Sequence, residues 1–180
     1  MADELQELKE RAEKAREDRS LAAVSLTMAV LAVFVAVVSL LGHRAHTEEV
    51  VLQAKASDQW AYYQAKTIRE HEDELFGDLA AVGASNDAAA MAKFREKAEQ
   101  EADRYKHDKE EIQAEARKLE QEVATERNRA DLFDLAEVFL EIGLVVTSIT
   151  LLSGRRIFWH LGIVLGVVGV VVAVMGAIAH

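Results

Sequence analysis

The chain has 180 residues, of which 51% are hydrophobic and 29% charged, and its net charge is -10. The absence of cysteine excludes disulfides, thiolate metal sites and a cysteine nucleophile. The negative charge argues against a nucleic-acid-binding protein, which needs a basic face. Proline, the strongest helix breaker, is also absent. Because the hydrophobic residues gather in three long blocks, the sequence predicts an all-α membrane protein with three transmembrane helices and leaves its biochemical role open.

Residues 1–20 are predicted to form a charged N-terminal helix. A narrow apolar stripe runs along it, made of Leu5, Leu8, Ala12 and Ala15. Oppositely charged pairs at i,i+4 spacing, such as Glu7 with Arg11, add modest support to a helix. A solvated extension and a partner-binding or membrane-surface helix both fit this pattern.

The first apolar block, Leu21 to Leu41, carries no charge and predicts a transmembrane helix over residues 21–42. A helix of this length rises about 30 Å, the thickness of a bilayer core. The block is longer than the apolar core of a secretory signal, and a charged segment precedes it. We therefore expect an uncleaved anchor.

Residues 43–131 form a polar insert that is predicted to be an antiparallel, coiled-coil-like helical hairpin. The upstream arm has an apolar stripe, Ala54, Ala61, Ala65, Ile68 and Leu75. The downstream arm has two heptad series, namely Ala102, Lys109, Ala116, Val123 and Ala130, and, three residues on, Tyr105, Ile112, Leu119, Glu126 and Phe133. Because alanines bury little apolar surface, we expect a second layer from neighbouring subunits, that is, a homo-oligomer.

The turn between the two arms is predicted near residues 77–86. This stretch and its border hold two glycines and three N-capping side chains, Gly77, Gly83, Ser85, Asn86 and Asp87. The heptads stay in phase as far as Phe133, so one helix is expected from about residue 87 to residue 152. Only Gly42 separates the first span from the upstream arm, and a lone glycine costs about 1 kcal/mol. The first span is therefore expected to continue into that arm.

The last two apolar blocks predict transmembrane helices at residues 132–153 and 157–179, joined as an antiparallel pair by a short link. Basic residues lie in the N-terminal segment and, as Arg155 and Arg156, in this link. With three spans these two regions share one side of the membrane, and the positive-inside rule makes that side cytoplasmic. The hairpin would then lie outside.

Four acidic residues at the start of the second span project from one face of a helix: Asp131, Asp134, Glu137 and Glu141. Glu141 lies about two turns inside the apolar block, where a charge costs about 2.5–3.5 kcal/mol at the span centre. We expect it to face a partner helix or water, or to be protonated. Three interpretations stay open: an acidic ring in a cation or proton path, a span that begins later, near Val138, or hydrogen bonds within a helix bundle.

The third span carries small residues on one face, and Gly162, Gly166 and Gly169 are predicted helix-packing positions. Their partner is either the second span or another subunit. The sequence has no nucleotide-binding glycine loop, no G-x-S-x-G nucleophile motif and no recognised zinc spacing. It therefore predicts no enzymatic activity, no metal and no cofactor.

The run from Ala56 to Lys66, ASDQWAYYQAK, is the most distinctive segment. It resembles the signature of a bacterial membrane-protein family known as domain of unknown function 4337. The resemblance extends over nearly the whole chain and implies a similar arrangement of spans in a bacterial inner membrane, but no activity. Glu141 departs from the uncharged polar residue more usual there in the family. The motif residues that we select as a candidate surface are Asp58, Gln59, Trp60, Tyr63, Gln64 and Lys66.

Within this motif, Trp60 and Tyr63 share a face at i,i+3. They either pack on the downstream arm, where Tyr105 and Phe94 are available, or form a ligand or partner surface. For the whole chain we expect an oligomeric scaffold that is anchored in membrane lipid. The hairpin is a candidate surface for a protein partner, and no nucleic-acid partner is expected. The alternative is an oligomeric cation or proton channel.

Overall fold

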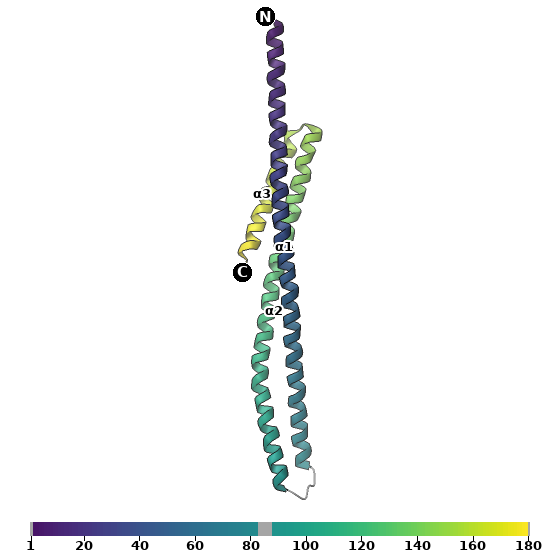
Figure 1. Cartoon of the computed structure of the whole chain (residues 1–180), viewed down its shortest axis with the longest axis vertical. Helices are drawn as coiled ribbons and strands as arrows, with labels where there is room; N and C mark the ends of the chain where they lie inside the picture. The colour runs from purple at the N-terminus through teal and green to yellow at the C-terminus, as the bar shows by residue number, and fades with distance from the viewer. Residues whose placement is uncertain (1, 83–87, 180) are drawn as a thin grey trace. The chain divides into compact units, whose positions relative to one another are not determined.

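The computed structural model describes residues 2–82 and 88–179, and within these residues the chain is helical without strands. Helix α1 is Ala2–Val82, α2 is Ala88–Ser153 and α3 is Arg156–Ile178 (Figure 1). Each helix contains a segment long and apolar enough to cross a membrane. The all-helical prediction is confirmed. The apolar stripe predicted for residues 1–20 rests on side chains outside the described set, but the Arg11–Glu7 ion pair is present at 2.7 Å.

The long helices are unbroken, as expected for α2 from its continuous heptads and for α1 from the low cost of the lone Gly42. Gly42 lies inside α1 and is buried. A Cβ at this position would be 3.3 Å from the Cβ of Phe133 on α2. The glycine therefore permits a close helix contact and does not interrupt the helix.

The predicted start of the turn, at Gly77, is wrong, because α1 continues to Val82. Gly77 is helical, and a Cβ there would lie 3.8 Å from the Cβ of Ala98, an ordinary contact. A single glycine costs a helix only about 1 kcal/mol, which contact with a neighbouring helix outweighs. The rest of the predicted turn, with Gly83, Ser85, Asn86 and Asp87, lies outside the described residues.

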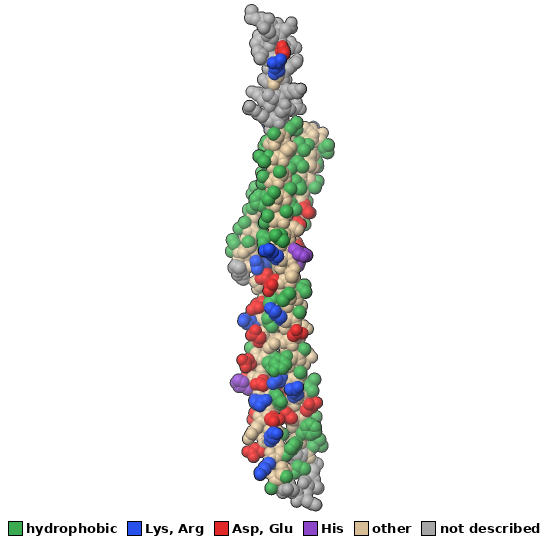
Figure 2. Space-filling model, viewed as in Figure 1, with side chains coloured by type: hydrophobic (Ala, Val, Ile, Leu, Met, Phe, Trp, Pro, Cys, Tyr) green, Lys and Arg blue, Asp and Glu red, His purple; other side chains and the backbone are tan. Residues whose placement is uncertain are grey.

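The chain divides into two compact units. The three-helix unit comprises residues 1–47 and 125–180, and the two-helix unit comprises residues 48–124. On the face shown in Figure 2, hydrophobic side chains cover the part of the three-helix unit that holds the apolar blocks, while acidic and basic side chains are mixed with hydrophobic ones over the two-helix unit. The two units thus present different chemistry to their surroundings.

The core of the three-helix unit lies between α1 and α2. Its buried members are Leu31, Val38 and Ala45 from α1, and Ala130, Phe133, Ala136 and Leu140 from α2. Helix α3 adds buried glycines to this core. The link before α3 turns at Gly154, whose φ of 63° lies in the left-handed region that favours glycine. Its N–H donates to the carbonyl of Thr150 at 2.9 Å and closes α2.

In the two-helix unit, α1 and α2 lie side by side with opposite chain directions (Figure 1). The buried residues on α2 belong to the predicted heptads: Ala102, Ile112, Ala116 and Val123. On α1 the buried hydrophobic residues are Leu52 and Ala56, and Glu70 is buried with them. Gln59, Tyr63, Lys66 and Asp73 are half-buried on the same side.

The predicted upstream stripe is therefore not the side of α1 that faces α2. Ala54, Ala61 and Ala65 are exposed, and Ile68 and Leu75 are exposed by 60% and 62%. Leu79, also exposed, extends this stripe by one turn. Helix α1 instead turns a polar heptad toward α2, where Trp60, Lys66 and Glu70 bond to side chains of α2.

Candidate functional site

The motif segment lies on α1 within the two-helix unit, and its aromatic residues reach toward α2. The indole Nε1 of Trp60 donates a hydrogen bond to Oε1 of Glu120 at 2.9 Å. The rings of Trp60 and Tyr63 meet edge to face, with centroids 5.6 Å apart. Of the other selected motif residues, Gln59 is half-buried, whereas Asp58 and Gln64 are exposed.

Lys66, the last motif residue, lies between two aromatic rings and a carboxylate. Its Nζ donates to Oδ2 of Asp108 at 2.9 Å. The same nitrogen is 5.0 Å from the ring centroid of Tyr105 and 5.6 Å from that of Tyr62, within cation–π range. Tyr105 thus contributes to the site. Phe94, the other aromatic residue available on α2, instead lines an open recess of about 360 Å³ together with Phe76.

The Lys66–Asp108 hydrogen bond shifts both groups toward their charged forms. It raises the pKa of Lys66 above its ordinary 10.5, against the opposing effect of burial. It lowers the pKa of Asp108 below its ordinary 3.8. Both charges therefore persist across the whole physiological pH range.

A second ion pair lies one turn farther along α1. The Nζ of Lys109 donates to Oε2 of Glu70, and the Glu70 side chain is only 5% exposed. Lys109 also lies 5.9 Å from the ring centroid of Tyr63. A buried carboxylate requires such a partner, because charged groups lose their hydration on burial.

Together these residues form what we call the polar clamp: Trp60, Tyr63, Lys66 and Glu70 on α1, and Asp108, Lys109 and Glu120 on α2. From Trp60–Glu120 to Lys66–Asp108 the contacts advance along α1 and retreat along α2, as antiparallel pairing requires, and Lys109 contacts both Tyr63 and Glu70. The sequence indicated Trp60, Tyr63 and Lys66 but missed the other four. One usable signal was a pair of seven-residue series on α1: Ala45, Leu52, Gln59 and Lys66, and, four residues after Leu52, Ala56, Tyr63 and Glu70.

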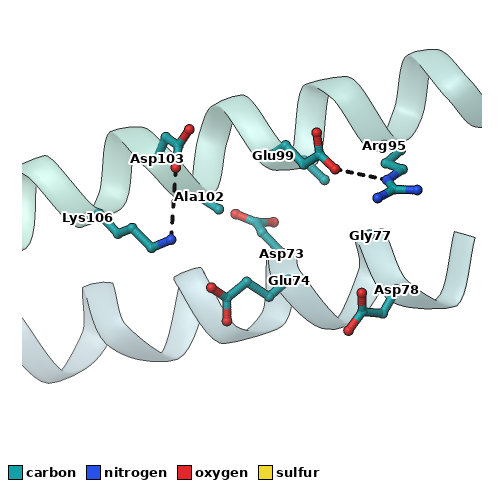
Figure 3. A pocket seen from close by; sticks show the side chains of 10 residues that line it. Asp73, Glu74, Gly77, Asp78, Arg95, Glu99, Ala102, Asp103 and Lys106 are labelled. Atoms are coloured by element: carbon teal, nitrogen blue, oxygen red, sulfur yellow. Dashed lines mark hydrogen bonds and ion pairs between the residues drawn. The ribbon is translucent and has the colours of Figure 1, made fainter. Parts of the chain in front are cut away.

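Beyond the clamp, small residues leave an open recess of about 430 Å³ between the helices (Figure 3). Gly77, Ala98 and Ala102 are the small residues in its wall. The charged residues in the wall are mostly acidic, namely Asp73, Glu74, Asp78, Glu99 and Asp103. The two basic ones are Arg95 and Lys106. Both cations pair with carboxylates on their own helix, Arg95 with Glu99 at 2.9 Å and Lys106 with Asp103 at 3.9 Å.

The four acidic residues of α2 belong to the three-helix unit, where their environments differ. Asp134 Oδ2 lies 3.1 Å from Nε2 of His46 on α1, a contact between residues 88 apart that sequence reasoning did not anticipate. Glu137 is half-buried, and Asp131 and Glu141 are exposed.

The glycines of α3 lie against the other helices of the same unit. A Cβ on Gly162 would be 2.0 Å from Oγ1 of Thr147, and one on Gly169 would be 2.7 Å from Cγ of Leu140, both on α2. A Cβ on Gly166 would meet Cδ2 of Leu31 on α1 at 2.5 Å. These glycines therefore bring α3 close to the neighbouring helices of its own chain.

No group of His, Asp or Glu side chains within residues 2–82 and 88–179 is arranged to hold a metal ion. Within the described residues, the protein is all-helical, and three of its helices are long and apolar enough to cross a membrane. The model of the family described as domain of unknown function (DUF4337) matches residues 20–179, so the chain belongs to this family. No curated protein and no solved structure matches the chain.

Proposed function

We propose that the protein is a homo-oligomeric membrane scaffold, anchored by the three-helix unit and interacting through the two-helix unit. The apolar helices and their glycine contacts support the anchor. The charged surface of the two-helix unit favours a place outside the lipid. We further propose a bacterial inner membrane, with the N-terminus and the Arg155–Arg156 link cytoplasmic and residues 43–131 outside. The proposal includes no catalytic activity.

The observation that carries this proposal is the outward stripe of α1, defined as Ala54, Ala61, Ala65, Ile68, Leu75 and Leu79. These residues recur at heptad spacing on a helix whose opposite side is already occupied by the polar clamp. The alanines permit close approach of a second helix, and the larger residues supply apolar area. The outward stripe is therefore suited to pair with the same stripe of a second copy.

Two acidic residues interrupt the outward stripe, and they indicate where pairing takes place. Asp58 and Glu72 occupy heptad positions between its apolar residues. Acidic residues at such positions weaken a coiled coil in dilute solution. Anchoring in one membrane raises the effective concentration of the copies and aligns them in parallel. We therefore expect pairing in membranes and weak association of the two-helix segment in water.

Site-directed disulfide formation tests this proposal, because the chain has no cysteine of its own. Ala65→Cys places one thiol on the outward stripe, and Ala114→Cys places one at an exposed alanine of α2 as a matched control. Mild oxidation in native membranes should give dimers with Ala65→Cys and monomers with Ala114→Cys. Equal dimer yields from both variants, or none from Ala65→Cys, would contradict the proposal.

A second candidate function is an oligomeric cation or proton path along the acidic face of α2. The observation that favours it is the series from the His46–Asp134 pair through half-buried Glu137 to Glu141, which extends into the apolar part of the unit. Purified protein in liposomes should then conduct ions, and Glu137→Gln with Glu141→Gln should reduce the flux. Liposomes that stay ion-tight at every tested pH would exclude this function.

A further inference from the structure

Glu141 lies level with the middle of both other helices of the three-helix unit. Its neighbour Leu140 packs against Gly169, and Gly143 packs against Gly162 and Gly166. These glycines bracket the centre of α3, which spans Arg156–Ile178. Gly166 in turn meets Leu31, the middle residue of the apolar block 21–41 of α1.

This position places Glu141 far from both edges of a bilayer. If the helices span a hydrocarbon core about 30 Å thick, its level is about 15 Å from either surface. Residues 142–152 alone rise only about 17 Å, which is about half of the hydrocarbon core. The other half must hold residues that precede Glu141, so a span that begins near Val138 would be too short. Asp134, which contacts His46, lies two turns nearer the end of the span.

The side chain of Glu141 points away from the unit's own core, among hydrophobic neighbours. Val138 and Val145, one turn to either side on the same face, are exposed by 50% and 60%. Helix α1 has no ionisable residue between Leu21 and Leu41, and α3 has only His160 between Ile157 and Ala179. On α2 itself, Glu137 lies one turn away, and it is also acidic.

We propose that Glu141 is an intramembrane proton-binding site, a carboxyl that holds its proton inside the bilayer and is reached from the lipid phase. The inference rests on the proposed membrane insertion. A carboxylate at this depth costs about 2.5–3.5 kcal/mol, and Glu141 has no basic group at its level to offset that cost. Binding a proton removes the charge, and the resulting O–H can donate to a nearby oxygen.

The ligand of the site is therefore a proton, and its neutral carboxyl is the species to detect. A protonated carboxyl adds across a C=N bond of a carbodiimide: its oxygen bonds to carbon, its proton passes to nitrogen, and no group leaves. Dicyclohexylcarbodiimide partitions into lipid, whereas a water-soluble cationic carbodiimide does not. The pair of reagents separates a protonated carboxyl in lipid from one in water.

The full-length protein in liposomes should be treated with each reagent and mapped by peptide mass spectrometry. The hydrophobic reagent should label Glu141. Glu141→Gln should remove this adduct, and the control Glu137→Gln should retain it. Labelling of Glu141 by the water-soluble reagent would overturn the proposal, as would a hydrophobic label confined to Asp134 or Glu137, or none.

Alkaline extraction of the same membranes tests the membrane anchor separately from the proton-binding site. A chain that stays in the lipid pellet while Glu141 remains unlabelled refutes the proton site and retains the anchor. A chain released into the supernatant refutes the membrane anchor itself. Glu141→Asp, which keeps a carboxyl, should preserve labelling and shows that the Gln variant loses it through chemistry and not through misfolding.

Discussion

In the three-helix unit, α3 approaches α2 through glycines, whereas in the two-helix unit α1 approaches α2 through tryptophan, tyrosine, lysine and glutamate. The first contact depends on shape, since a single added carbon would collide with its neighbour. The second depends on charge and hydrogen bonding, and among residues 48–79, whose burial is described, the only large buried aliphatic on α1 is Leu52. Two stretches of the same helices therefore use different interactions.

The difference follows from the surroundings that we propose for each unit. Lipid tails are as apolar as the helices, so helices in a bilayer associate mainly through close packing, which small residues permit. In water, burial of apolar surface is favourable, yet α1 leaves Ile68, Leu75 and Leu79 exposed and buries Glu70. A buried ion pair adds little net stability, and we infer that here it sets the register of the two helices. The arrangement keeps the apolar face of α1 available for another helix.

The largest effect is expected for Gly162→Ala in the three-helix unit. The new Cβ would lie 2.0 Å from Oγ1 of Thr147 and 2.7 Å from the carbonyl oxygen of Gly143. We expect a loss of about 3 kcal/mol in unfolding free energy, measured by circular dichroism during denaturation in mixed micelles. Gly166→Ala is the matched control, because the three atoms nearest its Cβ all belong to the flexible Leu31 side chain, and it should cost about 1 kcal/mol. Equal losses would contradict a shape-dependent contact.

The next effect is expected from the buried ion pair of the polar clamp. Lys109→Met removes the partner of the Glu70 carboxylate, and we expect it to cost about 2 kcal/mol of stability. The double variant Glu70→Leu with Lys109→Met should recover most of this loss, since no charge then stays buried. Thermal unfolding of the full chain in detergent measures both. A double variant as unstable as the single one would show that the loss does not come from an unpaired buried charge.

A smaller and pH-dependent effect is expected for Asp108→Asn. Because the Lys66 hydrogen bond lowers the pKa of Asp108 below 3.8, the pair stabilises the fold above that pH and loses its effect as pH falls through the lowered pKa. The raised pKa of Lys66 keeps the pair intact until the pH exceeds 10.5. The difference in Tm between wild type and variant should be constant from about pH 5 to about pH 9 and vanish in acid. A difference that persists at pH 2 would refute this assignment.

The smallest effect is expected for Trp60→Phe, which keeps an aromatic ring and removes one hydrogen bond to Glu120 near the surface. We expect a loss of about 0.5 kcal/mol. Glu120→Gln probes the same contact from the other side, and a double-mutant cycle should show that the two losses are not additive. Fully additive losses would mean that the contact contributes nothing to stability.

Much of the fold could be predicted because it depends on local pattern. Length and hydropathy identify the apolar helices, and the heptads of α2 mark Ala102, Ile112, Ala116 and Val123 as buried. Family membership could be recognised from the motif around Trp60 and is established by the match over residues 20–179. The helical continuation past Gly77 was missed because one glycine is a weak signal when a neighbouring helix packs against it.

The face of α1 that packs on α2 could not be predicted from hydrophobicity. Two heptads, one polar and one apolar, lie on this helix, and pattern alone selects the apolar one. The face that packs against α2 is determined by pairs such as Glu70 with Lys109. The two residues lie 39 positions apart, so no local sequence pattern indicates their contact. The contact of His46 with Asp134 is long-range in the same way.

The central claim is that α1 turns its polar heptad toward α2 and its apolar stripe outward, and a pair of engineered cysteines tests it directly. A Cβ at Gly77 would be 3.8 Å from that of Ala98, the spacing that a disulfide requires. Gly77→Cys with Ala98→Cys should form an intrachain disulfide in the cysteine-free chain, whereas Leu75→Cys with Ala98→Cys should not. Closure of the second pair and not the first would show that the apolar stripe faces α2 and would contradict the account.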